Sequence, residues 1–181
     1  MTANSAAGME RAAHGAAADC RTVVAGIGNI LLGDDGFGVE VARRLSGRAL
    51  PPGVEVSDVG IRSVHLAFDL LDGCRLLILA DASARGETPG TVTLLEVDPA
   101  TPGPGGPDGD MAAFDAHGLG PDAVLGLLGS LGARVGRILA VVCEPADTEP
   151  GIGLSPPVAA AVDAAAELIE RLVAELPAER R

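Results

Sequence analysis

The chain has 181 residues, of which 48% are hydrophobic, enough to bury one substantial core but too few for two comfortable domains. Its formal net charge is -12 and only 2% of its residues are aromatic, with no Trp or Tyr, which argues against binding of nucleic acid or anionic lipid. This charge favours a basic peptide or a metal cation as partner.

The first twenty residues are rich in alanine but contain Glu10, Arg11 and His14, so they lack the apolar core of a signal peptide. We therefore predict a disordered tail over residues 1–20 and a single domain over residues 21–181. The three cysteines show no paired spacing, which indicates neither a disulfide framework nor a zinc knuckle and fits a reducing cytosol. No apolar run reaches the length of a membrane span.

Five segments have the features of strands. Thr22–Ile27 is a nearly continuous apolar run, typical of a strand buried on both faces of a parallel sheet. Residues 76–80 form a second such run, which ends at Asp81. The other predicted strands are residues 54–59, 91–97 and 138–143.

Helical periodicity occurs between these strands. One stripe is formed by Val39, Ala42 and Leu45, and a second by Val64, Phe68 and Leu71. Two later helices are predicted: Pro121–Leu131, which can begin with proline, and a last helix that Ser155 can cap. Residues 101–110, between the strand at 91–97 and the helix at Pro121, are too rich in Pro and Gly for regular structure, and we predict a mobile loop there.

Five strands alternating with four helices predict a doubly wound α/β fold, a three-layer α/β/α sandwich. The five-stranded sheet is expected to be mostly parallel but mixed, because at least one neighbouring pair of strands is joined without a helix.

In an open α/β sheet, ligands bind beyond the carboxyl ends of the strands. Asp35 follows the first strand, Asp81 ends the third, and His117 lies in a loop just before a helix. Two carboxylates and an imidazole can hold a divalent first-row metal and leave coordination positions open. Each residue alone has a simpler interpretation, as a helix cap, an acceptor for loop amides or a solvated histidine.

A nucleotide site fits the sequence less well. Gly26 and Gly28 follow a strand, but Leu31 stands at the third position of the dinucleotide fingerprint. Asp34 and Asp35 would repel a phosphate at the start of the next helix. A P-loop is excluded because the chain contains no lysine.

Nucleophilic catalysis also has only weak candidates. The GSLG sequence at 129–132 lacks the order of a nucleophile elbow and falls in a helical segment. Cys143 stands at a strand end beside Glu144, where an apolar strand usually makes a thiol buried and inert.

Four blocks of sequence resemble the hydrogenase maturation protease family. They are GIGNILLGDDGFGVEVARRL at 26–45, LILADA at 77–82, HGLGPDAVLGLL from 117 and CEPADTEPGIGLSPPV at 143–158, all in family order. An ordered set is far more specific than any one block. The resemblance implies an α/β/α sandwich of the phosphorylase/hydrolase-like type, with metal-binding positions at Asp35, Asp81 and His117. The first position is Glu in some relatives, and Asp here keeps the charge with a shorter reach.

The resemblance further implies an endopeptidase that removes a C-terminal peptide from the nickel-loaded precursor of a nickel-iron hydrogenase large subunit. The nickel would arrive with the substrate. It would either assist amide hydrolysis as a Lewis acid or only license docking, with Asp35 or Asp81 as the base that activates water. The rival interpretations are a non-catalytic nickel-sensing chaperone and a nucleotide-binding module. A cytoplasmic monomer is expected.

One segment, residues 58–73, departs from the family pattern. Many members carry a Gly-Gly-Thr turn where this chain has Val59, Gly60 and Ile61. In this substrate-facing loop Arg62 and His65 are candidates for contact with the precursor, although a surface arginine and a helix-face histidine are the simpler interpretation.

Overall fold

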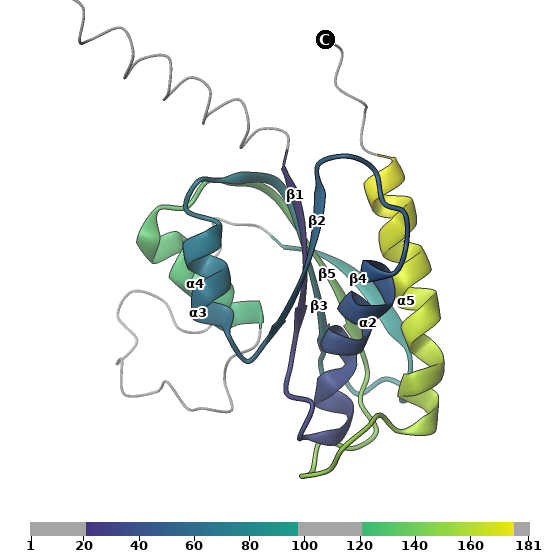
Figure 1. Cartoon of the computed structure of the whole chain (residues 1–181). Coiled ribbons are helices and arrows are strands. Elements are labelled where there is room, and N and C mark those ends of the chain that lie inside the picture. Colours follow the sequence, from purple (N-terminus) through teal and green to yellow (C-terminus); the bar gives the residue numbers. More distant parts are fainter. Residues whose placement is uncertain (1–20, 98–120, 176–181) are drawn as a thin grey trace, which may run out of the picture.

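The computed structural model describes residues 21–97 and 121–175 (Figure 1). The predicted tail, the Pro- and Gly-rich loop and His117 lie outside these residues. The strands are β1 (Thr22–Ile27), β2 (Val54–Gly60), β3 (Cys74–Ala82), β4 (Val92–Val97) and β5 (Val135–Cys143). The helices are η1 (Gly33–Gly36), α2 (Phe37–Ser46), α3 (Ser63–Asp69), α4 (Pro121–Leu131) and α5 (Pro156–Ala174). The predicted succession of strands and helices is confirmed.

The five strands form one sheet in the order β2-β1-β3-β5-β4. All neighbouring pairs are parallel except β4 and β5, which are antiparallel. β4 follows β3 without a helix and takes the edge position beyond β5, which confirms the prediction of a mixed sheet. The inner strands read as continuous apolar runs because helices cover both of their faces.

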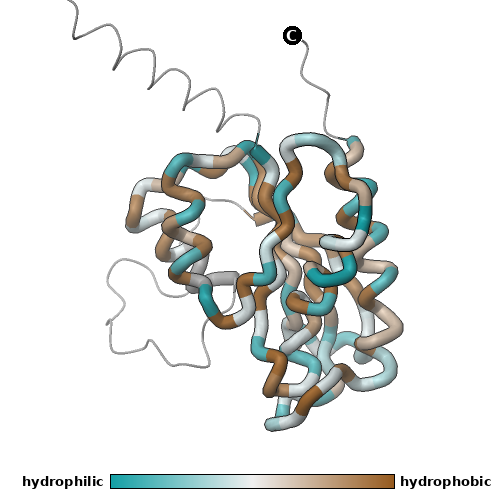
Figure 2. The backbone as a smooth tube through the Cα atoms, in the orientation of Figure 1, coloured by the Kyte–Doolittle hydropathy of each residue, from teal (hydrophilic) through white to brown (hydrophobic). Residues whose placement is uncertain are grey.

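The sheet is the middle of three layers. Helices α2 and α5 cover one face, and α3 and α4 cover the other (Figure 1). Alternate residues of each inner strand enter the two cores; on β1, for example, Val24 packs with α2 and α5, and Val23 and Ala25 pack with α3. The backbone coloured by hydropathy is accordingly brown along the central strands, while the helices alternate between brown and teal (Figure 2). Among the described residues, no helix is long and apolar enough to cross a bilayer.

The start of α2 is pressed against the ends of β1 and β3. A Cβ added to Gly38 would lie 2.0 Å from the carbonyl oxygen of Ala80 and 2.3 Å from that of Ile27. Only glycine permits this approach. The first turn of α2 therefore sits directly on the carboxyl ends of two neighbouring strands.

The apolar stripe predicted on α3 is present but faces solvent. Val64, Phe68 and Leu71 are 41%, 56% and 45% exposed. The residues of this segment that pack on the sheet are Leu66, Ala67 and Leu70. The segment has apolar residues on two sides, and the position of the sheet decides which side is buried.

Candidate active site

The carboxyl ends of β1 and β3 form a topological switch point. After β1 the chain passes through α2 to β2 on one side of it, and then through α3 to β3 on the other side. Helices α2 and α3 lie on opposite faces of the sheet (Figure 1). Ligands bind in the crevice that opens where the strand order reverses in this way, so this edge is the candidate active site.

Asp35 lies at this edge, in the η1 turn that follows β1 and packs against β3. Its side chain is partly buried, and Oδ2 accepts a hydrogen bond of 2.6 Å from the backbone N–H of Asn29. The turn needs glycine at position 28, where φ is 128° and a Cβ would lie 1.8 Å from the Asp35 carbonyl oxygen. Within the described part of the chain, Asn29 N–H is the one donor to this carboxylate. Its second oxygen, Oδ1, accepts no hydrogen bond from a described residue.

Asp81 lies at the same edge. β3 runs one residue past it, so Asp81 is inside the strand rather than after it, in register with Val142 of β5. Because Ala80 is in register with Gly26, Asp81 is level with Ile27, the last residue of β1. The side chain is 5% exposed and has an interaction partner. The fold thus brings the segments of two of the three predicted residues together.

The third predicted residue, His117, is outside the described residues. Within them, no three His, Cys, Asp or Glu side chains are grouped so that they could hold a metal ion. The three-residue metal site therefore stays a prediction. The structure places the segments of its two carboxylates, Asp35 and Asp81, at the same edge of the sheet.

Asp34, next to Asp35, has a structural role that the sequence analysis missed. It is fully buried, and its carboxylate accepts four hydrogen bonds. The donors are Ala146 N–H (2.8 Å), Asp147 N–H (3.0 Å), Ser155 N–H (2.6 Å) and Ser155 Oγ–H (2.8 Å). Oδ2 accepts three of these bonds and Oδ1 accepts one, and the side chain is fully buried, so the carboxylate is committed to holding the loop rather than exposed to a ligand.

These contacts also set the charge state of Asp34. Burial by itself would raise its pKa, but the hydrogen bonds from Ser155, Ala146 and Asp147 outweigh burial and hold the pKa below its ordinary value. The carboxylate stays ionised. Ser155, predicted as a helix cap, makes no side-chain cap on α5, and its hydroxyl donates to Asp34.

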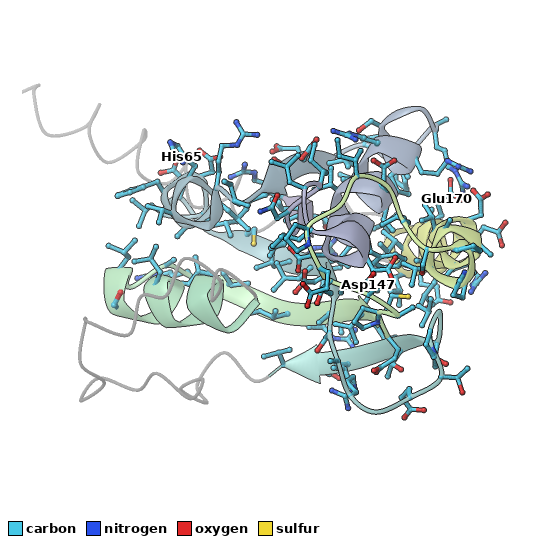
Figure 3. All side chains as sticks on the ribbon, turned by 90° about the horizontal axis from the view of Figure 1, so that it is seen from below. His65, Asp147 and Glu170 are labelled. Atoms are coloured by element: carbon cyan, nitrogen blue, oxygen red, sulfur yellow. The ribbon has the colours of Figure 1, made fainter. Side chains whose placement is uncertain are left out.

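Asp34 thereby fastens the loop between β5 and α5 to the η1 turn. The two segments also exchange backbone hydrogen bonds, from Gly33 N–H to Gly151 O (3.0 Å) and from Gly151 N–H to Leu31 O (2.9 Å). They line an open pocket of about 230 Å³. In the view onto this edge, Asp147 lies near the centre, beside the segment that leads into α2, and His65 points outward from α3 (Figure 3).

The other groups considered as nucleophiles are structural. Cys143 is fully buried, and burial, with the nearby charge of Asp34, raises the pKa of its thiol to about 11. Glu144 accepts hydrogen bonds from the N–H groups of Arg85 (2.7 Å) and Gly86 (3.2 Å), which lower its pKa. Ser130 of the GSLG sequence donates to the carbonyl of Leu127 within α4. The predicted burial of the Cys143 thiol is confirmed.

The sequence and the fold match known proteins over most of the chain. A sequence model of the hydrogenase maturation protease family matches residues 39–172. The chain is 36% identical over 151 residues to a Methanocaldococcus jannaschii protein assigned provisionally to these proteases, covering 81% of this chain and 92% of that protein. It is 31% identical over 150 residues to the Escherichia coli hydrogenase 2 maturation protease, covering 82% of this chain and 88% of that protein.

Solved structures agree with this assignment. The hydrogenase maturating endopeptidase HybD of Escherichia coli superposes with a TM-score of 0.70 at 33% identity, over 86% of this chain and 93% of that one. A hydrogenase 2 maturation peptidase from a Thaumarchaeota archaeon gives a TM-score of 0.64 at 31% identity, over 85% and 98% of the two chains. The chain therefore belongs to the hydrogenase maturation protease family and is a peptidase.

Proposed function

We propose that this peptidase removes a C-terminal peptide from the nickel-loaded precursor of a nickel-iron hydrogenase large subunit. The family supports a hydrogenase precursor as substrate. The observation that carries the assignment to this edge is the contrast between two adjacent acids. Asp34 is buried and accepts four hydrogen bonds from the loop between β5 and α5, whereas Asp35, at the switch point beside the end of β3, has one oxygen that accepts no hydrogen bond from a described residue.

In this proposal Asp35, Asp81 and His117 meet the nickel that the precursor carries. Two carboxylates and one imidazole form a hard to borderline donor set, which binds nickel only modestly. Modest affinity suits recognition, because the metal has to stay with the hydrogenase after cleavage. The peptidase thus recognises nickel as part of its substrate and needs no metal ion of its own.

The same residues carry the hydrolysis. Bound nickel supplies Lewis-acid polarisation in such a site. Asp35, with its unengaged oxygen, accepts a proton from the attacking water, whose oxygen adds to the scissile carbonyl carbon. The carbon–nitrogen bond then breaks, and the proton passes to the leaving amine. On this assignment the activity is of the aspartyl type, with Asp81 and His117 holding the nickel-bearing segment in place.

We place the reaction in the cytoplasm. Cys74 and Cys143 are buried and unpaired with each other. Free thiols are the usual state of cysteine in a reducing compartment.

The test is the mass of the precursor after incubation with the purified protein, in nickel-loaded and nickel-free form. We expect a loss of mass only with nickel. Asp35→Asn, Asp81→Asn and His117→Ala should each slow processing by at least about 100-fold, the size of a general-base or positioning contribution. Glu149→Gln is the matched control, since Glu149 is an exposed acid that lines the pocket at the same edge.

Two results would contradict the proposal. A stable complex with an unchanged precursor mass would make the protein a nickel-sensing chaperone. Normal cleavage by the Asp35 and Asp81 variants would remove the site assignment.

A further inference from the structure

The exposed side of α3 carries a line of large apolar residues that nothing in the described structure covers. It consists of Ile61 (57% exposed), Val64 (41%), Phe68 (56%) and Leu71 (45%), which we call the α3 face. The spacing of three, four and three residues puts all four on one side of the helix and its flanking turns. Single exposed apolar residues are ordinary, but a contiguous line of this kind marks an interaction site.

The α3 face begins at the candidate active site. Ile61 follows Gly60, whose carbonyl accepts a hydrogen bond of 3.1 Å from Gly28 N–H. The next residue, Asn29, donates to the carboxylate of Asp35. From this edge α3 runs back along the sheet, opposite to the strand direction (Figure 1). A partner on the α3 face would therefore reach the catalytic edge with one of its ends.

Charge distinguishes the two ends of the α3 face. At the far end, the side chains of Asp69 and Asp72 are exposed and make no ion pair with a described residue. At the near end, the guanidinium of Arg62 donates to the carbonyl oxygens of Asp58 (2.8 Å) and Val59 (3.3 Å). The far end thus carries two carboxylates without a described ion-pair partner, next to Arg21, which pairs with Glu55 and donates to the Asp69 carbonyl oxygen (2.8 Å). The near end carries the positive charge of Arg62, whose described hydrogen-bond partners are neutral carbonyl oxygens.

We propose that the α3 face is the docking surface for an amphipathic helix of the hydrogenase precursor. This helix presents apolar side chains at helical spacing to the α3 face and basic side chains to Asp69 and Asp72. The proposal rests on the proposed function and adds a second contact, outside the catalytic edge, that selects the substrate. It also gives a role to the segment that departs from the family pattern.

The test compares steady-state cleavage of nickel-loaded precursor by the full-length protein and its variants. For Phe68→Ser we expect KM to rise at least tenfold with kcat unchanged, because the α3 face contacts substrate equally before and during reaction. Asp69→Lys combined with Asp72→Lys should raise KM in the same way. Leu94→Ser is the matched control, since Leu94 on β4 is 41% exposed but lies on the opposite edge strand. Thermal unfolding checks that every variant is folded.

An unchanged KM for the Phe68 and Asp69/Asp72 variants would overturn the proposal. So would a wild-type dimer in light scattering that Phe68→Ser converts to a monomer with wild-type KM, because a second copy would then be the occupant. If the wild-type protein leaves the precursor intact, the proposed function fails, and calorimetric binding of nickel-loaded precursor decides the docking separately. Tenfold weaker binding by Phe68→Ser would support docking, and equal binding would refute it.

Discussion

The buried carboxylate of Asp34 predicts a large and pH-dependent loss of stability in Asp34→Asn. The variant keeps the shape of the side chain but replaces one accepting oxygen with an NH₂ group. If that group takes the place of Oδ1, it meets the Ser155 N–H, which is 2.6 Å from this oxygen in the wild-type protein. Two donors then face each other in a buried position, where an unsatisfied group is costly.

The magnitude follows from the bonds that are lost. A hydrogen bond to a charged group contributes about 1.5 to 3 kcal/mol, and an unsatisfied buried donor costs about 1 to 3 kcal/mol. Because the remaining bonds weaken when the charge is removed but the surrounding loop relaxes, we expect Asp34→Asn to lower the free energy of unfolding by about 2 to 4 kcal/mol. Ser155→Ala removes only the hydroxyl bond of 2.8 Å and should cost about 1 to 2 kcal/mol.

The loss should depend on pH with a defined sign. The pKa of Asp34 is lowered by folding, so its contribution is complete above the ordinary aspartate pKa of about 3.9. As the pH falls below that value, the unfolded chain binds a proton that folded Asp34 resists, and the contribution declines until the pH passes the folded pKa. The difference between wild type and Asp34→Asn is therefore expected to be constant near neutrality and to narrow in acid.

The measurement is urea unfolding followed by far-UV circular dichroism, since the chain has no Trp or Tyr for fluorescence. The protein should be free of nickel so that only the hydrogen bonds contribute. A difference below about 1 kcal/mol at neutral pH would refute the reasoning from saturated hydrogen bonds. A difference that does not narrow between about pH 5 and pH 3 would refute the assignment of the lowered pKa.

The packing and the thiols support two further predictions. Gly38→Ala should destabilise the fold by about 3 kcal/mol or more, because the added Cβ would lie 2.0 Å from the backbone oxygen of Ala80. Gly47→Ala is the control: the atom nearest to its added Cβ would be 3.8 Å away, so this variant should be close to neutral in the same urea assay. Cys143 and Cys74, whose thiol pKa values burial raises to about 11, should react with a thiol reagent at pH 8 only after unfolding. Peptide mapping separates these two thiols from Cys20, and rapid labelling of Cys74 or Cys143 in the native protein would contradict their buried positions. Cys143→Ser should keep peptidase activity.

Local pattern was sufficient for the elements themselves. The run Thr22–Ile27 was predicted to the residue, because a strand buried on both faces is nearly continuously apolar and this run ends before Gly28. Pro121–Leu131 was likewise predicted with its bounds, because proline fits the first turn of a helix and glycine follows its end. The strand-end rule also selected Asp35 and Asp81 before their edge of the sheet was known.

Contacts between distant segments decided the rest. The strand order, and with it the switch point between β1 and β3, depends on which apolar runs pair, and apolar runs of similar length do not encode their partners. The neighbouring acids Asp34 and Asp35 likewise look equivalent in the sequence, which does not show which of them has a structural role. The loop before α5, more than a hundred residues later in the chain, donates four hydrogen bonds to Asp34, whereas the described donor to Asp35 is the nearby Asn29 N–H.

Helix α3, which has apolar residues on two sides, also shows what the sequence determines and what the tertiary structure decides. Its residues at helical spacing include both Leu66 with Leu70 and Val64 with Phe68, so periodicity predicts the helix but not its buried side. The sheet covers the first pair because α3 has to cross from β2 to β3 over that face. Sequence alone determined that the segment is a helix with the stripe Val64, Phe68 and Leu71. The tertiary structure determined that this stripe remains exposed beside the candidate active site, while Leu66 and Leu70 are buried.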